Sequence, residues 1–364
     1  MSKRIKIIFT GGGSAGHVTP SLPLISAFKR KDAEVFYVGS EQGIERTLIE
    51  ALNIPYYPIT TGKLRRYWTW KNLLTPFQLL LGIWQSFLLC RRLKPDVIFS
   101  KGGFVALPIV IAARLNGIPV VIHESDLSPG LANRLSFPFA KLICITFAAT
   151  AQFFKNQSKV LLTGMPIREF LYHGDPEKGL KLCEFTDNKK PVLLVMAGGL
   201  GSIVINEAIR RLVPPLTKEF QIIHLCGKNK YDPSFEGLVA YKQFEYLQDE
   251  LADVLACADL VLSRAGATSI YELLALAKPH ILLPLSKKAS RGDQIDNAKY
   301  FSLQGFSQVI YAEEFSDEKL RKKILDCYQN LYQLKQNLID FKPMDSVKII
   351  TEKLTSLIAT DDPS

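Results

Sequence analysis

Two glycine-rich turns constrain this chain most, because each follows a short apolar run and precedes a helical pattern. The first spans residues 10–17 (TGGGSAGH) and the second spans residues 197–202 (AGGLGS). Glycine tolerates positive φ and lets the backbone approach a ligand closely, and a following helix offers free N–H groups. A strand–turn–helix unit in each half of the chain predicts two domains of related design.

Short apolar runs alternate with helical patterns along the whole sequence. Continuous apolar strands of this kind form parallel sheets that helices cover on both faces. We therefore predict an α/β chain with two Rossmann-like, doubly wound domains. The expected strands are residues 5–10, 34–38, 96–100, 119–123 and 142–146 in the first half, and 192–196, 221–226, 260–263 and 280–284 in the second.

A chain of 364 residues has room for two such domains. Residues 163–166 (TGMP) form a Gly/Pro turn without helical periodicity, so we place the boundary there. The expected domains are residues 1–163 and 164–344, with a C-terminal helix within 345–364 that packs back on the first domain. The six cysteines lie far apart with no Cys-x-x-Cys pair, so neither a disulfide scaffold nor a structural zinc site has support.

The net charge of +10 is concentrated in residues 63–94, which contain seven basic side chains and no acidic one. Pro76 and several polar residues interrupt the apolar stretch of this segment, so we do not expect it to span a membrane. It is either a core-facing helix with solvated basic ends or a patch that lies on a membrane surface.

The absence of acids and the presence of all three tryptophans favour the membrane-surface patch. Its apolar members would meet lipid while arginines meet anionic head groups. Nucleic acid is not an expected partner, because apolar residues outnumber the polar ones that a phosphate groove needs. The predicted patch comprises Trp68, Trp70, Phe77, Leu80, Leu81, Trp84 and Phe87, flanked by Arg65, Arg66, Arg91 and Arg92.

The first glycine turn satisfies G-x-G-x-x-G, which leaves an NAD-dependent oxidoreductase open as an alternative. A dinucleotide site of this kind has an acidic residue at the end of the second strand, and the only acid near that position is Glu41. A strand-to-helix turn that binds no ligand is a further alternative. His17 follows the last glycine of the motif. In the first turn of a helix the dipole disfavours a charged histidine, which suits a neutral general base.

A third turn, Lys101-Gly102-Gly103-Phe104, follows the strand expected at 96–100. The carboxyl ends of strands form the ligand edge of an open α/β sheet, and all three turns lie at such ends. Two sheets whose ligand edges face each other would make a cleft suited to one or two diphosphates.

Six motifs follow one another along the chain: Gly12-Gly13-Ser14-Ala15-Gly16-His17-Val18-Thr19-Pro20, Lys101 to Phe104, His123-Glu124, Gly164-Met165-Pro166-Ile167-Arg168, Arg264-Ala265-Gly266-Ala267 with Glu272, and Asp293-Gln294 with Asn297-Ala298. In this order they resemble the motifs of the MurG family of peptidoglycan glycosyltransferases, and the resemblance covers nearly the whole chain.

The resemblance implies a GT-B fold, in which two Rossmann-like domains face each other across a cleft. It implies inverting transfer of N-acetylglucosamine from UDP to the 4-hydroxyl of a muramoyl-pentapeptide carried on undecaprenyl diphosphate. That acceptor is lipid I and the product is lipid II, in peptidoglycan synthesis. The enzyme would work as a peripheral protein on the cytoplasmic face of the plasma membrane, with an anionic surface as partner.

The resemblance also assigns residues. His17 matches the family's proposed catalytic base, and Arg168 matches a residue near the donor diphosphate. Glu272 matches a ribose ligand and Gln294 a ligand of the donor sugar. The remaining matched donor positions are Ser14, Ala15, Gly16, Asp126, Gly199, Ala267, Thr268 and Ser269, and the acceptor positions are Lys101, Gly102, Gly103, Phe104 and Asn133.

Two positions depart from the family. Asp126 stands where asparagine is usual, and an acid there repels an anionic donor unless a cation pairs with it. Gly199 stands where serine is usual, which leaves only backbone N–H groups for phosphate. The chain contains no Asp-x-Asp motif, so we expect no metal and no cofactor, with a helix terminus and Arg168 neutralising the leaving group.

Overall fold

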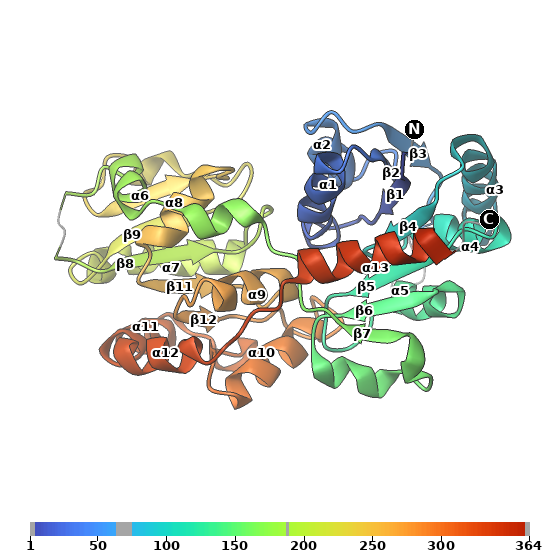
Figure 1. Ribbon diagram of the computed structural model, residues 1–364. Coiled ribbons are helices and arrows are strands. Elements are labelled where there is room, and N and C mark those ends of the chain that lie inside the picture. The colour runs from blue at the N-terminus through green and yellow to red at the C-terminus, as the bar shows by residue number, and fades with distance from the viewer. Residues whose placement is uncertain (1–3, 63–74, 187–188, 361–364) are drawn as a thin grey trace. The chain divides into compact units, whose positions relative to one another are not determined.

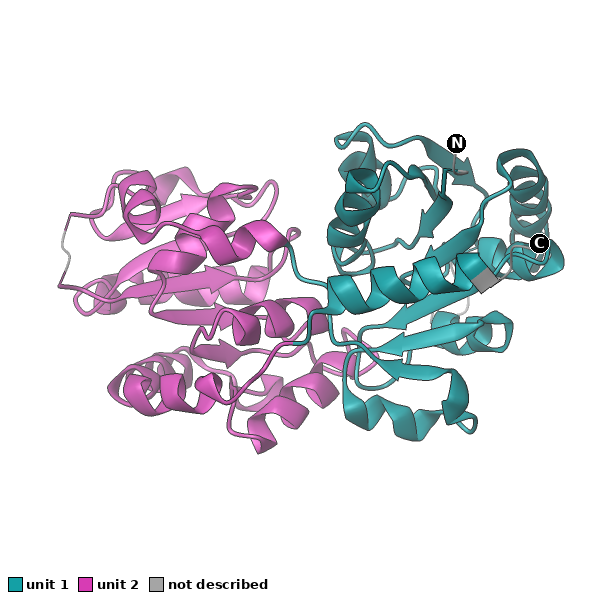
Figure 2. Cartoon of the chain, viewed as in Figure 1, with its two compact units in different colours: residues 1–168, 344–364 teal, residues 169–343 magenta. Residues whose placement is uncertain are grey.

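The computed structural model describes residues 4–62, 75–186 and 189–360, and the chain divides into two compact units (Figure 2). Unit 1 comprises residues 1–168 and 344–364, and unit 2 comprises residues 169–343. The C-terminal residues therefore return to the unit formed by the N-terminal half. The boundary predicted from the sequence, after residue 163, lies five residues before the end of the segment 1–168, in the same Gly/Pro connection.

Unit 1 contains a seven-stranded, all-parallel sheet in the order β3-β2-β1-β4-β5-β6-β7. The order reverses between β1 and β4, so loops that leave these neighbouring strands emerge at the switch point where ligands bind in such sheets. The strands are β1 Lys6–Thr10, β2 Glu34–Ser40, β3 Tyr56–Ile59, β4 Val97–Ser100, β5 Val120–Glu124, β6 Leu142–Ile145 and β7 Val160–Leu162.

Alternation along β1 builds a core on each face of this sheet. Ile7 and Phe9 belong to one buried cluster, and Ile8 belongs to another. Helices cover both faces, as a doubly wound sheet requires (Figure 1). They are α1 Ser21–Arg30, α2 Ile44–Glu50, α3 Thr75–Leu93, α4 Leu107–Leu115, α5 Leu131–Ser136 and α13 Ser346–Thr360.

Unit 2 repeats the design with six parallel strands in the order β10-β9-β8-β11-β12-β13. Its strands are β8 Val192–Met196, β9 Gln221–Leu225, β10 Tyr241–Phe244, β11 Leu260–Ser263, β12 His280–Leu282 and β13 Gln308–Val309. Its helices are α6 Pro176–Leu182, α7 Ile203–Leu216, α8 Glu250–Cys257, α9 Ala267–Ala275, α10 Asp293–Leu303, α11 Asp317–Gln329 and α12 Leu331–Ile339.

The buried face of helix α3 carries mainly small or polar side chains, and Leu89 and Leu93 near its end also pack against the core. Gly82 and Ser86 are buried, and a Cβ on Gly82 would lie 2.1 Å from the carbonyl oxygen of Thr60. The opposite face exposes large apolar side chains, among them Phe77 at 72% and Trp84 at 60%. One face of the helix thus packs on the core of unit 1, and the membrane-surface patch stays a prediction.

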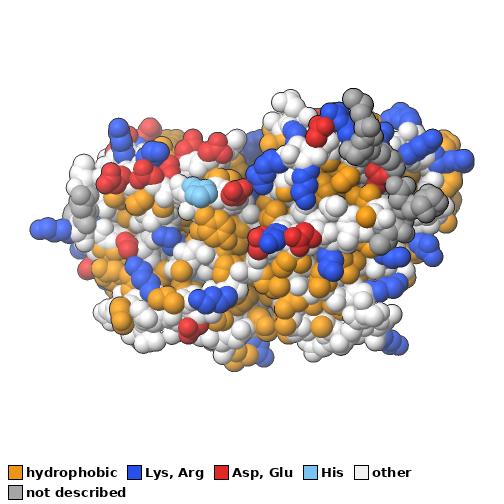
Figure 3. All heavy atoms as spheres, viewed as in Figure 1, with side chains coloured by type: hydrophobic (Ala, Val, Ile, Leu, Met, Phe, Trp, Pro, Cys, Tyr) orange, Lys and Arg blue, Asp and Glu red, His pale blue; other side chains and the backbone are white. Residues whose placement is uncertain are grey.

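No helix in the described parts of the chain combines the length and apolarity needed to cross a membrane. Four members of the predicted patch, Trp68, Trp70, Arg65 and Arg66, lie outside the described residues. The other members lie on α3, where hydrophobic and basic side chains occur next to one another (Figure 3).

The C-terminal helix α13 packs on unit 1 through side chains of its inner face. Ile350 and Leu354 are fully buried in the same cluster as Leu24 and Phe28 of α1. In Figure 1 the helix runs along the sheet of unit 1 as a red ribbon. This arrangement explains why a segment so distant in sequence belongs to the first unit.

We predict that Leu354→Ala destabilises unit 1 by about 2–5 kcal/mol, because it deletes a fully buried side chain and leaves a cavity. The exposed Lys353→Ala is the matched control on the same helix. All three tryptophans fall within the sequence of unit 1, so their fluorescence during urea unfolding follows this unit alone. Equal midpoints for the two variants would contradict the packing.

Candidate active site

The first glycine turn is anchored inside unit 1 by two side chains from neighbouring elements. Tyr37 of β2 donates its hydroxyl to the carbonyl oxygen of Gly11 at 2.8 Å. The N–H of Gly13 donates to Oε2 of Glu45, on α2, at 3.1 Å. Burial and the charge of Glu45 raise the pKa of Tyr37 well above its usual value, so the phenol remains a donor. These bonds fix the shape of the turn.

His17 occupies a different local structure from the expected one. It is the last residue of the short 3₁₀ helix Ala15–His17, and α1 begins only at Ser21. The prediction that His17 lies in the first turn of a helix is therefore wrong, and the helix dipole does not govern its charge. The mismatch arises because the glycine-rich segment tightens into a 3₁₀ turn before the α-helix starts.

The hydrogen bonds of His17 set its tautomer instead. Its Nδ1 lies 3.1 Å from the carbonyl oxygen of Gly12 and 3.1 Å from Oγ of Ser14. Because a carbonyl oxygen only accepts, Nδ1 carries the hydrogen in this arrangement and Nε2 carries the basic lone pair. The half-buried ring can therefore accept a proton at Nε2.

The third glycine turn packs directly against the first, since it follows the adjacent strand β4. Gly102 and Gly103 have φ of +95° and +82°, which favours glycine at both positions. A Cβ on Gly103 would lie 2.5 Å from the Gly12 carbonyl oxygen and 3.4 Å from Nδ1 of His17. The structure thus brings the predicted acceptor turn and the predicted base together in one unit.

Behind the third turn lies a buried polar network that begins with Lys101. Its Nζ donates to Nδ1 of His123 at 2.8 Å and also to Oγ of Ser125. His123 donates from Nε2 to the carbonyl oxygen of Gly164 at 2.8 Å. Burial, helped by the Lys101 charge, lowers the pKa of His123 well below its usual value, which keeps the ring neutral and able to accept.

The carboxylate of Glu124 organises the adjoining loop. Oε2 accepts from Nδ2 of Asn133 at 2.8 Å and from the N–H of Gly130 at 3.2 Å, and Oε1 accepts from the N–H of Asp126 at 3.0 Å. Burial raises the pKa of Glu124, with a smaller contribution from Asp126. This carboxylate therefore fixes the backbone on which Asp126 stands.

This network explains how the chain accommodates Asp126 at a position where the family usually has asparagine. Burial lowers the pKa of Lys101 to about 8, while the negative fields of Glu124 and Asp126 raise it. The ammonium thus lies within the field of Asp126 and offsets the acid that stands in place of the usual asparagine. Such compensation is what the predicted donor contact of Asp126 would require.

The buried positions of Lys101 and Asn133 limit what their side chains can contact. Both point into unit 1, and a Cβ on Gly102 would lie 2.3 Å from Oδ1 of Asn133. A contact with the acceptor would come from Gly102, Gly103 and the half-buried Phe104. The acceptor assignments stay a prediction.

In unit 2 the second glycine turn is tied to the neighbouring strand through Arg264. This guanidinium donates to Oγ of Ser202 at 2.5 Å and to the carbonyl oxygen of Leu283 at 3.0 Å. Ser202 also accepts from the N–H of Ile205 and so caps α7. A Cβ on Gly199 would meet only a ring carbon of Tyr246 at 3.9 Å, so the serine usual at this position would fit.

The remaining donor positions lie on α9, on α10 and at the end of unit 1. Ala267, Thr268 and Ser269 open α9, and Glu272 is buried one turn further along. Gln294 accepts at Oε1 from the N–H of Leu285, which fixes the loop after β12. The half-buried Arg168 is the last residue of the first segment of unit 1. These assignments also stay predictions.

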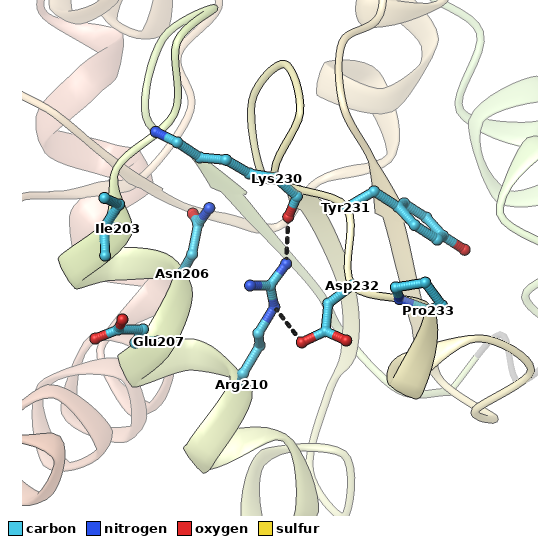
Figure 4. A pocket seen from close by; sticks show the side chains of 8 residues that line it. All are labelled: Ile203, Asn206, Glu207, Arg210, Lys230, Tyr231, Asp232 and Pro233. Carbon is cyan, nitrogen blue, oxygen red and sulfur yellow. Dashed lines mark hydrogen bonds and ion pairs between the residues drawn. The ribbon is translucent and has the colours of Figure 1, made fainter.

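A hollow of about 240 Å³ lies beside α7 and contains none of the predicted site residues (Figure 4). Arg210 points into it and pairs with Asp232, with Nε and Oδ2 3.8 Å apart. The same guanidinium donates to the carbonyl oxygen of Lys230 at 2.5 Å. The charge of Arg210 is thus paired within unit 2, and we assign the hollow no ligand.

Sequence reasoning missed Glu45, Tyr37 and the role of Arg264 because none of them lies in a glycine turn. One signal was present: two glycines, Gly39 and Gly43, lie within the six residues before Glu45, which indicates a crowded backbone there. The acid expected to matter there was Glu41, two residues before Gly43.

The comparisons with known proteins agree along the chain. The model of the glycosyltransferase family 28 N-terminal domain matches residues 7–145, and that of the C-terminal domain matches residues 192–350. A Legionella pneumophila protein is 52% identical over 97% of this chain and 96% of its own length. One from Geobacillus thermodenitrificans is 51% identical over 92% and 94%. Both are named UDP-N-acetylglucosamine–N-acetylmuramyl-(pentapeptide) pyrophosphoryl-undecaprenol N-acetylglucosamine transferase.

Solved structures show the same fold at low identity. MurG of Acinetobacter baumannii has a TM-score of 0.74 at 23% identity and covers 97% of this chain and 99% of its own. The calicheamicin glycosyltransferase CalG4 has a TM-score of 0.70 at 12% identity and covers 99% and 100%. The expected GT-B class of fold is confirmed, and nothing supports the oxidoreductase alternative.

We predict that Lys101 and Asp126 are energetically coupled. Lys101→Met removes the buried cation and should cost about 3–5 kcal/mol of unit 1 stability, because the nearby acids lose their counter-charge. The double variant Lys101→Met/Asp126→Asn should cost less than the sum of its single changes, by about 0.5–3 kcal/mol.

Urea unfolding followed by tryptophan fluorescence measures these terms. The exposed Lys141→Met serves as the matched control. Strict additivity of the two single changes would show that the lysine does not compensate for the acid.

Proposed function

This chain belongs to glycosyltransferase family 28, and on that premise we propose that it transfers N-acetylglucosamine from UDP to the 4-hydroxyl of an N-acetylmuramyl-pentapeptide on pyrophosphoryl-undecaprenol. The observation that carries this proposal is the 52% identity over 97% of the chain to transferases with that name. The product is the disaccharide lipid precursor of peptidoglycan, and the reaction belongs to cell-wall synthesis.

His17 is the proposed general base. Its Nε2 lone pair takes the proton of the acceptor hydroxyl as that oxygen attacks the anomeric carbon. The bond from the anomeric carbon to the UDP oxygen breaks, and the electron pair leaves with UDP. Attack from the face opposite the leaving group inverts the anomeric centre. The Nδ1–H bond to the Gly12 carbonyl supports this role, since it leaves Nε2 as the basic nitrogen.

Departing UDP carries negative charge, which amide N–H groups and Arg168 are proposed to stabilise. The amides come from Ser14 to Gly16 and from the start of α9 at Ala267 to Ser269. Glu272 is proposed to accept from the ribose hydroxyls, and Gln294 to bind the donor sugar. Asp126 and Gly199 complete the proposed donor set. The cleft between the two domains remains part of the proposal.

We expect His17→Ala to lower kcat at least about 100-fold, the range that a positioned general base contributes. The Kd for UDP-N-acetylglucosamine should stay within about threefold, because it is the acceptor proton that His17 handles. Initial rates and calorimetric donor titration measure the two quantities. The exposed His173→Ala controls for loss of a histidine. A His17→Ala enzyme with the turnover of the parent would remove this residue from the base role.

We further propose that α3 docks the enzyme on an anionic membrane, at the cytoplasmic face where the donor nucleotide is present. The exposed side chains of Phe77, Leu80, Leu81 and Trp84 form an apolar surface, and Arg91 and Arg92 end the same helix. An apolar face flanked by cations is the pattern of a helix that lies in the lipid interface. Docking of this kind would bring the enzyme to its acceptor, because the polyprenyl tail of the acceptor lies in the membrane.

We predict that the double change Leu80→Gln/Trp84→Gln weakens binding to phosphatidylglycerol vesicles more than about 10-fold. Each full burial of such a side chain contributes roughly 1.5–3 kcal/mol. Vesicle co-sedimentation measures the effect, and turnover of a short-chain, water-soluble acceptor should stay unchanged. Leu303→Gln/Tyr332→Gln, two exposed apolar positions of unit 2, is the matched control. Equal loss in both double variants would argue against docking through α3.

A further inference from the structure

The carboxylate of Glu45 is fully buried at the back of the first glycine turn, although nothing in the proposed reaction uses it. Buried glutamates require partners, and this one has hydrogen-bond donors on both oxygens. Oε2 accepts from the N–H of Gly13 at 3.1 Å. Oε1 accepts from the N–H of Ser40 at 3.1 Å and from the Ser40 hydroxyl.

Two glycines make the space that this carboxylate occupies. A Cβ on Gly12 would lie 2.5 Å from Cδ of Glu45, and one on Gly43 would lie 2.0 Å from Oε1. Neither glycine has positive φ, so backbone conformation alone does not demand glycine there. The buried side chain therefore explains both glycines, and Gly12 lies within the first glycine turn.

One peptide group links Glu45 to His17. The N–H that Glu45 accepts from belongs to Gly13, and the carbonyl that holds Nδ1 of His17 belongs to Gly12. These two groups are the opposite ends of the same planar peptide unit. Holding the N–H on the carboxylate therefore fixes the direction of the carbonyl, and the carbonyl fixes the imidazole.

The link also has an electrostatic consequence. A carboxylate on the N–H end polarises the peptide, so its carbonyl oxygen becomes a stronger acceptor. When Nε2 takes the acceptor's proton, the ring becomes an imidazolium whose Nδ1–H points at that oxygen. The arrangement supports the charge that forms on the ring during the reaction.

We propose that Glu45 is a positioning residue that acts on His17 through the Gly12–Gly13 peptide. It holds the imidazole in the Nδ1–H tautomer, in which the lone pair that takes the acceptor proton is on Nε2. The catalytic part of this inference rests on the proposed function, whereas the tautomer part is a property of the folded chain. In the reaction the proton moves from the hydroxyl to Nε2 and later to water.

Glu45→Gln tests the link because it keeps the size of the side chain and removes its charge. An amide has one accepting oxygen, so its NH₂ group must face either the Gly13 N–H or the Ser40 pair. We expect kcat to fall about 10- to 100-fold, since small misplacement of a catalytic group has effects of that order. The KM for UDP-N-acetylglucosamine should stay within about twofold, because this part of the turn handles the acceptor proton.

Nitrogen-15 NMR of the histidine rings provides the readout that simple destabilisation would not produce. In the parent, the spectrum of His17, assigned with His17→Ala, should show Nδ1 protonated and Nε2 unprotonated. In Glu45→Gln the two tautomers should both be populated. An Nε2–H tautomer in the parent, or an unchanged tautomer and kcat in a folded Glu45→Gln, would overturn the proposal.

Glu50→Gln is the matched control, since Glu50 lies on the same helix and pairs with Arg46 at the surface. Should Glu45→Gln not fold, Ser40→Ala removes one donor to the carboxylate and leaves the rest of the turn intact; it should lower kcat about two- to fivefold with a detectable second tautomer. Unchanged values there would equally contradict the link. A parent that transfers no N-acetylglucosamine yet shows the expected tautomers would instead refute the proposed function alone.

Discussion

A single peptide group, between Gly12 and Gly13, holds the first glycine turn, the His17 ring and the third glycine turn of unit 1 together. A parallel sheet brings the loops of β1, β2 and β4 to one edge, and these loops meet around that peptide. Glu45 binds its N–H, His17 binds its carbonyl, and Gly103 packs on the carbonyl oxygen. The glycines of this edge therefore allow backbone and buried carboxylate to approach each other, in addition to any role with a ligand.

Unit 1 also buries two charged side chains close to its glycine turns. The Glu45 carboxylate and the Lys101 ammonium are both fully buried, and each is satisfied by several hydrogen bonds. Such groups contribute little net stability, because desolvation offsets their interactions, but removing one partner is costly. In this unit the two buried groups fix the positions of neighbouring loops. One holds the turn that carries His17, and the other balances the loop that carries Asp126.

Continuous apolar runs predicted nine strands, and all nine are present within two residues of the expected bounds. The four strands that were missed, β3, β7, β10 and β13, lie at or near sheet edges. They are short, or they alternate as Tyr241 to Phe244 does, so they lack a buried apolar run. Topology, not local pattern, places such strands.

The candidate site likewise has a part that the local sequence predicts and a part that depends on the fold. The glycine turns were predictable because their residue types serve local geometry. The buried position of the Lys101 side chain depends on His123 and Ser125, which are distant in sequence, and could not be predicted from the local pattern. Glu45 looked like any glutamate at the start of a helix, and only the packing of β1, β2 and α2 reveals its contact with the turn.

Competition between donors tests the account most directly. The purified chain would be incubated with a muramyl-pentapeptide diphospholipid and equal concentrations of UDP-N-acetylglucosamine and other UDP-sugars. Mass spectrometry and NMR of the product then identify the added sugar and its anomeric configuration. The account predicts one β-linked N-acetylglucosamine per acceptor, with UDP released in equal amount. Preference for another sugar, an α-linkage, or hydrolysis of the donor without transfer would contradict it.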